Sequence, residues 1–165
     1  MTGGNIILTQ EIAEKKLQRM AYEIAERNSG EDAVILAGVK ESGYVIAVKI
    51  KDMLSGIFNG SVEIIGIELD KKNPGEIKIS SPTKFDNKVV ILVDDVANTG
   101  KTLLYSLQPF LSSHPKKIQT LVLVERTHKL FPVKSDYVGL SVATTLQENI
   151  IVEVVNGEIT GAFLQ

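Results

Sequence analysis

The stretch Val89-Val-Ile-Leu-Val-Asp-Asp-Val-Ala-Asn-Thr-Gly-Lys-Thr102 decides the fold of this chain. It opens with five aliphatic residues in a row, a pattern typical of a central parallel strand that is buried on both faces. Asp94 and Asp95 end the predicted strand, and a helix is predicted to begin near Gly100. Ligands of open α/β sheets bind at the carboxyl ends of the strands, so a binding site is expected in this turn.

The residues of the turn suit a phosphate at one end and a sugar at the other. The first turn of a helix offers unpaired N–H groups and a positive dipole end. Gly100 lets the backbone approach an anion closely, and Thr99 and Thr102 add hydroxyl donors. Asp94 and Asp95 would repel a phosphate, but they can accept hydrogen bonds from a sugar diol or hold magnesium.

Two other interpretations of the same residues stay open. Gly100-Lys101-Thr102 has the ending of a Walker A loop, but that motif requires glycine where this chain has Asp95, and a carboxylate there would repel a triphosphate. An ordinary strand-to-helix turn, capped by Asp95 or Asn98, would explain one polar residue. It would not explain why two acids and two threonines occur together in this turn.

Strands and helices alternate along most of the remaining chain. Thr9 is a predicted N-cap for a helix that runs to about Arg27. Pro109 should kink or end the helix that begins near Gly100. A second helix is expected over 44–54, and further strands over 33–37, 62–69, 119–124, 136–139, 150–155 and 159–163. We therefore expect one α/β domain over residues 1–165 with a mainly parallel sheet.

Composition narrows the class of protein. The chain has no cysteine, which excludes disulfides, thiolate zinc sites and cysteine nucleophiles. No apolar run approaches the roughly 20 residues that span a bilayer, and no secretory signal is evident, so a cytoplasmic protein is expected. The formal net charge is -2, which gives no support to RNA binding, because such proteins usually carry a basic excess.

An aliphatic strand followed by two acids, four intervening residues and Thr-Gly-x-Thr resembles the motif with which type I phosphoribosyltransferases bind 5-phosphoribosyl-1-pyrophosphate (PRPP). Residues 21–28, 38–43 and 123–139 look like the bifunctional pyrimidine operon attenuation protein/uracil phosphoribosyltransferases. The resemblance implies a type I phosphoribosyltransferase-like fold with a small hood. It also implies transfer of the phosphoribosyl group to a nucleobase, best uracil, with release of diphosphate, and it implies Mg²⁺, a homodimer and a regulatory role through RNA.

The resemblance assigns roles to individual residues, although it leaves the metal ligands open. Asp94 and Asp95 would be catalytic. Lys40, Glu41, Ser42 and Gly43 would form the diphosphate loop, for which a plain strand-to-helix turn is the alternative. In the base pocket, Tyr137 would pack against the base and the Val138 backbone would read its edge; a core aromatic is the alternative for Tyr137. PRPP would contact Asp94, Asp95, Val96, Ala97, Asn98, Thr99, Gly100, Lys101 and Thr102.

The chain departs from this family in its basic residues. Ser42 stands where the family usually has arginine, and Glu41 adds a negative charge beside it. Residues 70–87 match the mobile catalytic loop in position, but they carry Lys71 and Lys72 in place of an arginine. These departures keep a second hypothesis open, a non-catalytic PRPP or nucleotide sensor that acts through RNA. An α/β domain without affinity for PRPP is the third.

The 6-oxopurine phosphoribosyltransferases are a rival subfamily. They resemble the chain at 124–127 and 136–139, but two positions argue against them. Asn98 replaces an aspartate that could act as a base, and an amide takes up no proton near neutral pH. Glu125, an acceptor, replaces a lysine that donates to the purine oxygen.

Overall fold

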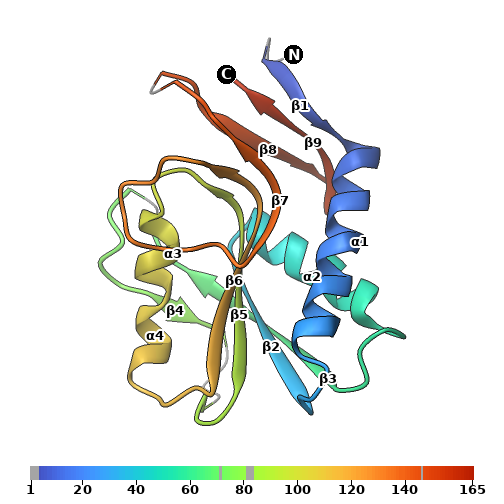
Figure 1. Ribbon diagram of the computed structural model, residues 1–165. Coiled ribbons are helices and arrows are strands. Elements are labelled where there is room, and N and C mark those ends of the chain that lie inside the picture. The colour runs from blue at the N-terminus through green and yellow to red at the C-terminus, as the bar shows by residue number, and fades with distance from the viewer. Residues whose placement is uncertain (1–3, 71, 81–83, 146) are drawn as a thin grey trace.

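A six-stranded sheet with the order β4-β3-β2-β5-β6-β7 forms the centre of the molecule (Figure 1). The computed structural model describes residues 4–70, 72–80, 84–145 and 147–165. Only the short β4 pairs antiparallel with its neighbour, which confirms an α/β fold with a mainly parallel sheet. The strands are β2 (Ala33–Val39), β3 (Ser61–Glu68), β4 (Lys78–Ile79), β5 (Val89–Ala97), β6 (Lys117–Arg126) and β7 (Tyr137–Val142).

Helices cover both faces of this sheet. Helices α1 (Gln10–Arg27) and α2 (Ser42–Leu54) pack on one face, and α3 (Lys101–Ser106) and α4 (Gln108–Leu111) pack on the other (Figure 1). Consecutive residues of β5 enter the two cores alternately, so the aliphatic run is buried on both faces, as predicted. In the described part of the chain, no helix is long and apolar enough to cross a membrane.

The observed ends of three elements can be compared with the ends predicted from the sequence. Thr9 caps α1 by accepting a hydrogen bond from the Ile12 N–H at 3.3 Å, as predicted. The helix after β5 is interrupted at Leu107, two residues before Pro109, and a break caused by this proline was also predicted. The end of β5 was predicted wrongly: the strand runs through both acids to Ala97, because its ladder with β6 continues to the pair Ala97 and Glu125.

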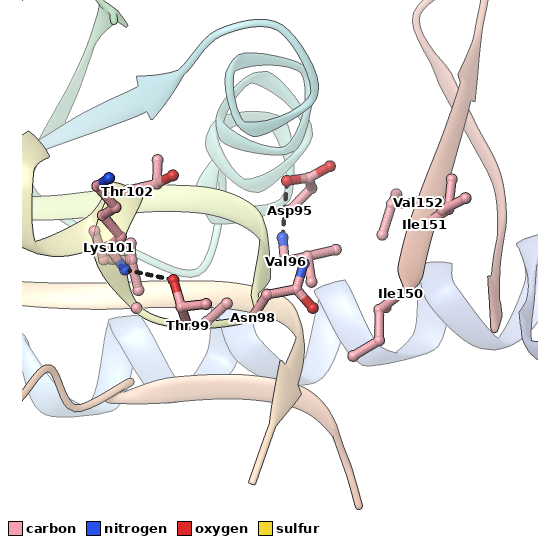
Figure 2. A pocket seen from close by; sticks show the side chains of 12 residues that line it. Asp95, Val96, Asn98, Thr99, Lys101, Thr102, Ile150, Ile151 and Val152 are labelled. Atoms are coloured by element: carbon pink, nitrogen blue, oxygen red, sulfur yellow. Dashed lines mark hydrogen bonds between the residues drawn. The ribbon is translucent and has the colours of Figure 1, made fainter. Parts of the chain in front are cut away.

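A second, three-stranded antiparallel sheet forms a hood above the carboxyl ends of the parallel strands (Figure 1). Its order is β1-β9-β8, with β1 (Asn5–Thr9), which was not predicted, β8 (Ile150–Val155) and β9 (Glu158–Leu164). Strand β8 lies opposite the turn that follows β5 (Figure 2). The hood therefore places an apolar strand across from the turn predicted to bind phosphate.

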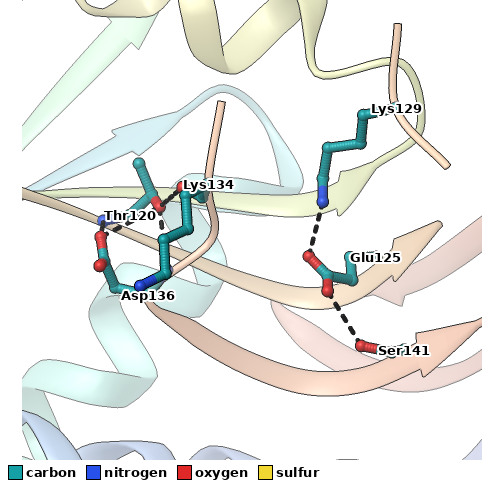
Figure 3. A network of polar contacts seen from close by, with 6 residues as sticks. All are labelled: Thr120, Glu125, Lys129, Lys134, Asp136 and Ser141. Atoms are coloured by element: carbon teal, nitrogen blue, oxygen red, sulfur yellow. Dashed lines mark hydrogen bonds and ion pairs between the residues drawn. The ribbon is translucent and has the colours of Figure 1, made fainter. Parts of the chain in front are cut away.

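The connection between β6 and β7 supports that turn from behind. The Thr99 carbonyl accepts hydrogen bonds from the N–H groups of Leu130 at 2.9 Å and Phe131 at 3.0 Å. At the other end of the connection, the Asp136 carboxylate accepts from the Thr120 N–H of β6 at 2.9 Å (Figure 3). One contact joins the connection to the turn and the other joins it to β6, so the turn rests on a fixed support.

Glu125 joins the same connection to β6 and β7 (Figure 3). Its carboxylate accepts from the Lys129 ammonium at 2.8 Å and from the Ser141 hydroxyl at 3.0 Å. Burial by itself would raise the pKa of the Glu125 carboxyl, but the hydrogen bonds from Lys129 and Ser141 outweigh it and hold the pKa below its ordinary value. The Glu125 and Lys129 side chains are only 17% and 14% exposed, so water weakens this ion pair less than it weakens a surface pair.

The lowered pKa of Glu125 predicts how the pair responds to pH. A carboxyl whose pKa is lower in the folded state adds stability above its unfolded value, about 4.3, and loses it as the pH falls through the folded value. Glu125→Gln should therefore cost about 1 kcal/mol of unfolding free energy at pH 7, the size of a partly buried ion pair. Urea denaturation at pH 7 and below pH 4 measures both proteins, and their difference should shrink in acid.

Glu14→Gln is the matched control, because Glu14 lies exposed on α1. This variant should follow the wild type at both pH values. A cost for Glu125→Gln that stayed constant or grew in acid would contradict the role given to the Lys129 and Ser141 contacts.

Candidate functional site

A cavity of about 250 Å³ lies between the turn after β5 and strand β8 (Figure 2). Residues Asp95 to Leu103 line one side of it, and Ile150, Ile151 and Val152 line the other. The structure thus brings together every residue predicted to bind PRPP except Asp94. One wall is polar and rich in backbone groups, whereas the opposite wall is aliphatic.

The turn itself is shaped by Gly100 and Thr99. Gly100 has a φ of +85°, in the left-handed region where side chains other than glycine are strained. A Cβ at this position would also lie 3.4 Å from the Phe131 carbonyl oxygen. The Thr99 hydroxyl accepts a hydrogen bond from the Lys101 N–H at 3.2 Å, which fixes its oxygen beside the cavity (Figure 2).

The two acids of the motif occupy different environments. Asp95 lines the cavity, and its carboxylate accepts from the Val96 N–H at 2.8 Å (Figure 2). Asp94 is 0% exposed, and its carboxylate accepts from the Asp95 N–H at 2.9 Å. Both acids lie on the strand, where consecutive side chains point to opposite faces. Asp95 can therefore reach a ligand in the cavity, whereas Asp94 holds the backbone beneath it. A shared role of both acids in orienting a sugar stays a prediction.

The predicted diphosphate loop touches β5 next to these acids. A Cβ on Gly43 would lie 2.6 Å from the Val93 carbonyl oxygen and 3.0 Å from the Asp94 Cα, so glycine permits this close approach. Glu41 and Ser42 line a second cavity, of about 440 Å³, which is closed by β8 and β9. Both cavities are lined by Ile151 and Val152 and therefore adjoin along β8.

Lys40, the cation of that loop, forms an ion pair with Glu68 at the end of β3. Its hydrogen bond to the Glu68 carboxylate raises the pKa of Lys40, and the same bond lowers the pKa of Glu68. The Lys40 N–H donates to the Ile67 carbonyl at 2.9 Å. Lys40 therefore points toward β3 in this structure, and a diphosphate would have to replace Glu68 as its partner.

The predicted base-binding residues, Tyr137 and Val138, do not line this cavity. Tyr137 is fully buried, with its hydroxyl donating to Gln119 at 2.8 Å and the Arg27 guanidinium 4.9 Å from its ring centre; burial raises the pKa of Tyr137. The Val138 carbonyl accepts from Arg19 at 2.8 Å. Both residues lie at the start of β7, paired with Leu121 and Val122 of β6, and neither lines the cavity.

Sequence reasoning missed the residues of the opposite wall. Ile150 to Val152 were predicted as part of a strand, but only tertiary folding shows that this strand faces the turn. Arg126 was also missed: its guanidinium donates to the Thr145 carbonyl at 3.0 Å and the Glu148 carbonyl at 2.5 Å, just before β8. The same group donates to the Asn98 side-chain oxygen at 3.4 Å, so Arg126 links the turn to the hood.

Residues 70–87 are the segment expected to close over the site. Lys71 lies outside the described residues, and Lys72 is exposed, with its N–H donating to Asp70 at 2.9 Å. Phe85 is buried against Phe110, with ring centres 4.7 Å apart. Closure of residues 70–87 over a substrate stays a prediction.

Known proteins were compared with this chain in sequence and in fold. The phosphoribosyl transferase domain matches residues 3–156. The bifunctional protein PyrR of Fusobacterium nucleatum is 36% identical over 155 residues, which cover 88% of each chain. The bifunctional protein PyrR of Clostridium kluyveri is 34% identical over 158 residues, covering 90% of this chain and 89% of that one.

Among solved structures, the hypoxanthine phosphoribosyltransferase of Trypanosoma cruzi aligns with a TM-score of 0.80 and covers 97% of this chain and 95% of that one. Its sequence identity is 17%, so the likeness concerns the fold. The fold, the turn after β5 and the matched domain agree, and the chain belongs to the phosphoribosyltransferase family.

Proposed function

We propose that this protein transfers the 5-phosphoribosyl group of PRPP to uracil and releases diphosphate. The cavity between the turn and β8 carries the proposal, because it joins a phosphate-binding turn, a carboxylate and an aliphatic wall. A phosphate, a sugar and a flat base need these three environments in this order. The PyrR relatives at 34% and 36% identity support a pyrimidine as the base.

The residues of the cavity have separate tasks in this reaction. The turn from Ala97 to Thr102 anchors the 5-phosphate, so binding energy away from the reacting carbon fixes its position. Asp95 accepts hydrogen bonds from the ribose hydroxyls, and its negative field favours the positive charge that develops on the sugar. The bond from the anomeric carbon to diphosphate breaks, a bond to the base nitrogen forms, and the proton of that nitrogen leaves to solvent.

The base lies between Val96 and the aliphatic residues of β8 in this proposal. These side chains line the cavity from opposite sides and exclude water from one face of the reacting centre. Tyr137 and Val138 have no part in the base site, since neither lines the cavity.

Magnesium fits the site when it binds together with the phosphates of the substrate. Within the described ranges, no three His, Asp or Glu side chains are grouped so that they could hold a metal ion by themselves. Mg²⁺ is usually bound by one or two carboxylates together with substrate phosphates, and Asp95 can provide the carboxylate. When bound, the ion neutralises the charge of the leaving diphosphate.

A non-catalytic nucleotide sensor is the second candidate function. It would explain the ion pair of Lys40 with Glu68 and the negative charge of Glu41 at the second cavity. Release of diphosphate from PRPP with any base separates the enzyme from the sensor. The family resemblance adds a homodimer, a cytoplasmic location and RNA binding to the proposal, and salt-dependent RNA binding would test the last of these.

Asp95→Asn tests the role of the carboxylate in catalysis. The variant keeps the size of the side chain but removes its negative charge, so kcat/KM for diphosphate release should fall about 100-fold or more. Asp52→Asn, an exposed residue of α2, makes the same exchange away from the site and should match the wild type. Equal rates for Asp95→Asn and the wild type would exclude Asp95 from the reaction.

Glu68→Gln tests whether Lys40 binds diphosphate. The variant releases Lys40 from its ion pair, so the Kd for PRPP with magnesium should fall severalfold in calorimetry. Uridine monophosphate, which lacks the diphosphate, should bind to both proteins equally. If the affinity for PRPP did not change, or if both ligands gained equally, Lys40 would have no place in the diphosphate loop.

A further inference from the structure

We propose that Asn98 recognises the base by donating a hydrogen bond from its side-chain amide to a carbonyl oxygen of the base, and that Arg126 sets the orientation of this amide. Arg126 is thus a positioning residue, which acts through Asn98. The inference rests on the proposed function and names the residue that selects the base.

The chemistry of the Arg126 contact fixes which end of Asn98 faces the cavity. The Asn98 oxygen lies 3.4 Å from a guanidinium nitrogen of Arg126. A guanidinium group has donors only, so the atom that faces it must be the amide oxygen. The amide NH₂ group then points away from Arg126, on a residue that lines the cavity. Figure 2 shows the Asn98 side chain on the side of the turn that faces Ile150.

Arg126 is itself held before any base arrives. Its other guanidinium contacts are the carbonyl oxygens of Thr145 and Glu148, at 3.0 Å and 2.5 Å. These carbonyls belong to the connection that leads into β8, and the guanidinium is part-buried between this connection and the turn. The donor is therefore pre-oriented, which lowers the entropy cost of recognising the base.

This arrangement requires a hydrogen-bond acceptor on the base. A neutral NH₂ group that is fixed in this direction can only donate, so the base must offer an acceptor there. Uracil carries ring carbonyl oxygens that meet this requirement, whereas a base that places an N–H donor at the same point would leave both groups without a partner. The other lining residues opposite the turn, from Ile150 to Val152, are aliphatic and give no such selection.

Binding measurements test the inference without relying on turnover. The ratio of the affinities for uridine monophosphate and ribose 5-phosphate, measured by calorimetry, isolates the contribution of the base. Asn98→Ala should lower the affinity for uridine monophosphate about fivefold to tenfold, the effect of one hydrogen bond. It should leave ribose 5-phosphate unchanged, because the backbone N–H groups of the turn, which anchor the phosphate, are kept. Asn59→Ala, an exposed asparagine before β3, is the matched control and should leave both affinities unchanged.

Arg126→Met tests the positioning role. It removes all the donors of Arg126, so the affinity for uridine monophosphate should fall by a similar factor. In the double variant with Asn98→Ala, the two losses should not multiply, because both changes remove the same hydrogen bond. Losses that multiply would show that Arg126 acts through the hood connection and would overturn its role as the positioning residue of Asn98.

The outcomes separate this inference from the proposed function. If the wild type binds uridine monophosphate no more tightly than ribose 5-phosphate, the base site of the proposed function fails and Asn98 loses its role with it. If the wild type prefers the nucleotide and Asn98→Ala keeps the full preference, the function stands and the inference is overturned.

Discussion

The close contact of the β5 backbone with its neighbours is the constraint on which the site depends. On one side, the start of α2 approaches so closely that a Cβ on Gly43 would lie 2.6 Å from the Val93 carbonyl oxygen. On the other side, the Thr99 carbonyl is held by the N–H groups of Leu130 and Phe131. The turn between these contacts cannot shift without disturbing both, so its hydroxyl and amide groups are pre-organised for an anion.

The two sheets make the two walls of the cavity chemically different. The parallel sheet supplies a strand end with a carboxylate, followed by small and hydroxyl residues, while the antiparallel hood supplies an aliphatic strand. Arg126 spans the two sheets by binding the Asn98 oxygen and two carbonyls that precede β8. The distance between the polar and the apolar wall is thus fixed by hydrogen bonds as well as by packing. That combination suits a ligand with a charged end and a flat, nearly apolar end.

The sequence predicted the features that depend on residues close together in the chain. The aliphatic run of β5, the N-cap Thr9 and the break near Pro109 depend on neighbouring residues, and all three were found as expected. The burial of Asp94 required knowledge that β5 continues past it. The position of Tyr137 depends on the register of β7 against β6, and that of Ile150 on how the hood folds back over the sheet. The spacing of residues along one segment does not predict such long-range pairings.

A crystal structure with uridine monophosphate bound is the most direct test of the account. We expect the phosphate oxygens within hydrogen-bonding distance of the Thr99 and Thr102 hydroxyls and the backbone N–H groups between them, with the ribose beside Asp95 and the base against β8. A phosphate that binds away from this turn, or a base that stacks on Tyr137, would contradict the account.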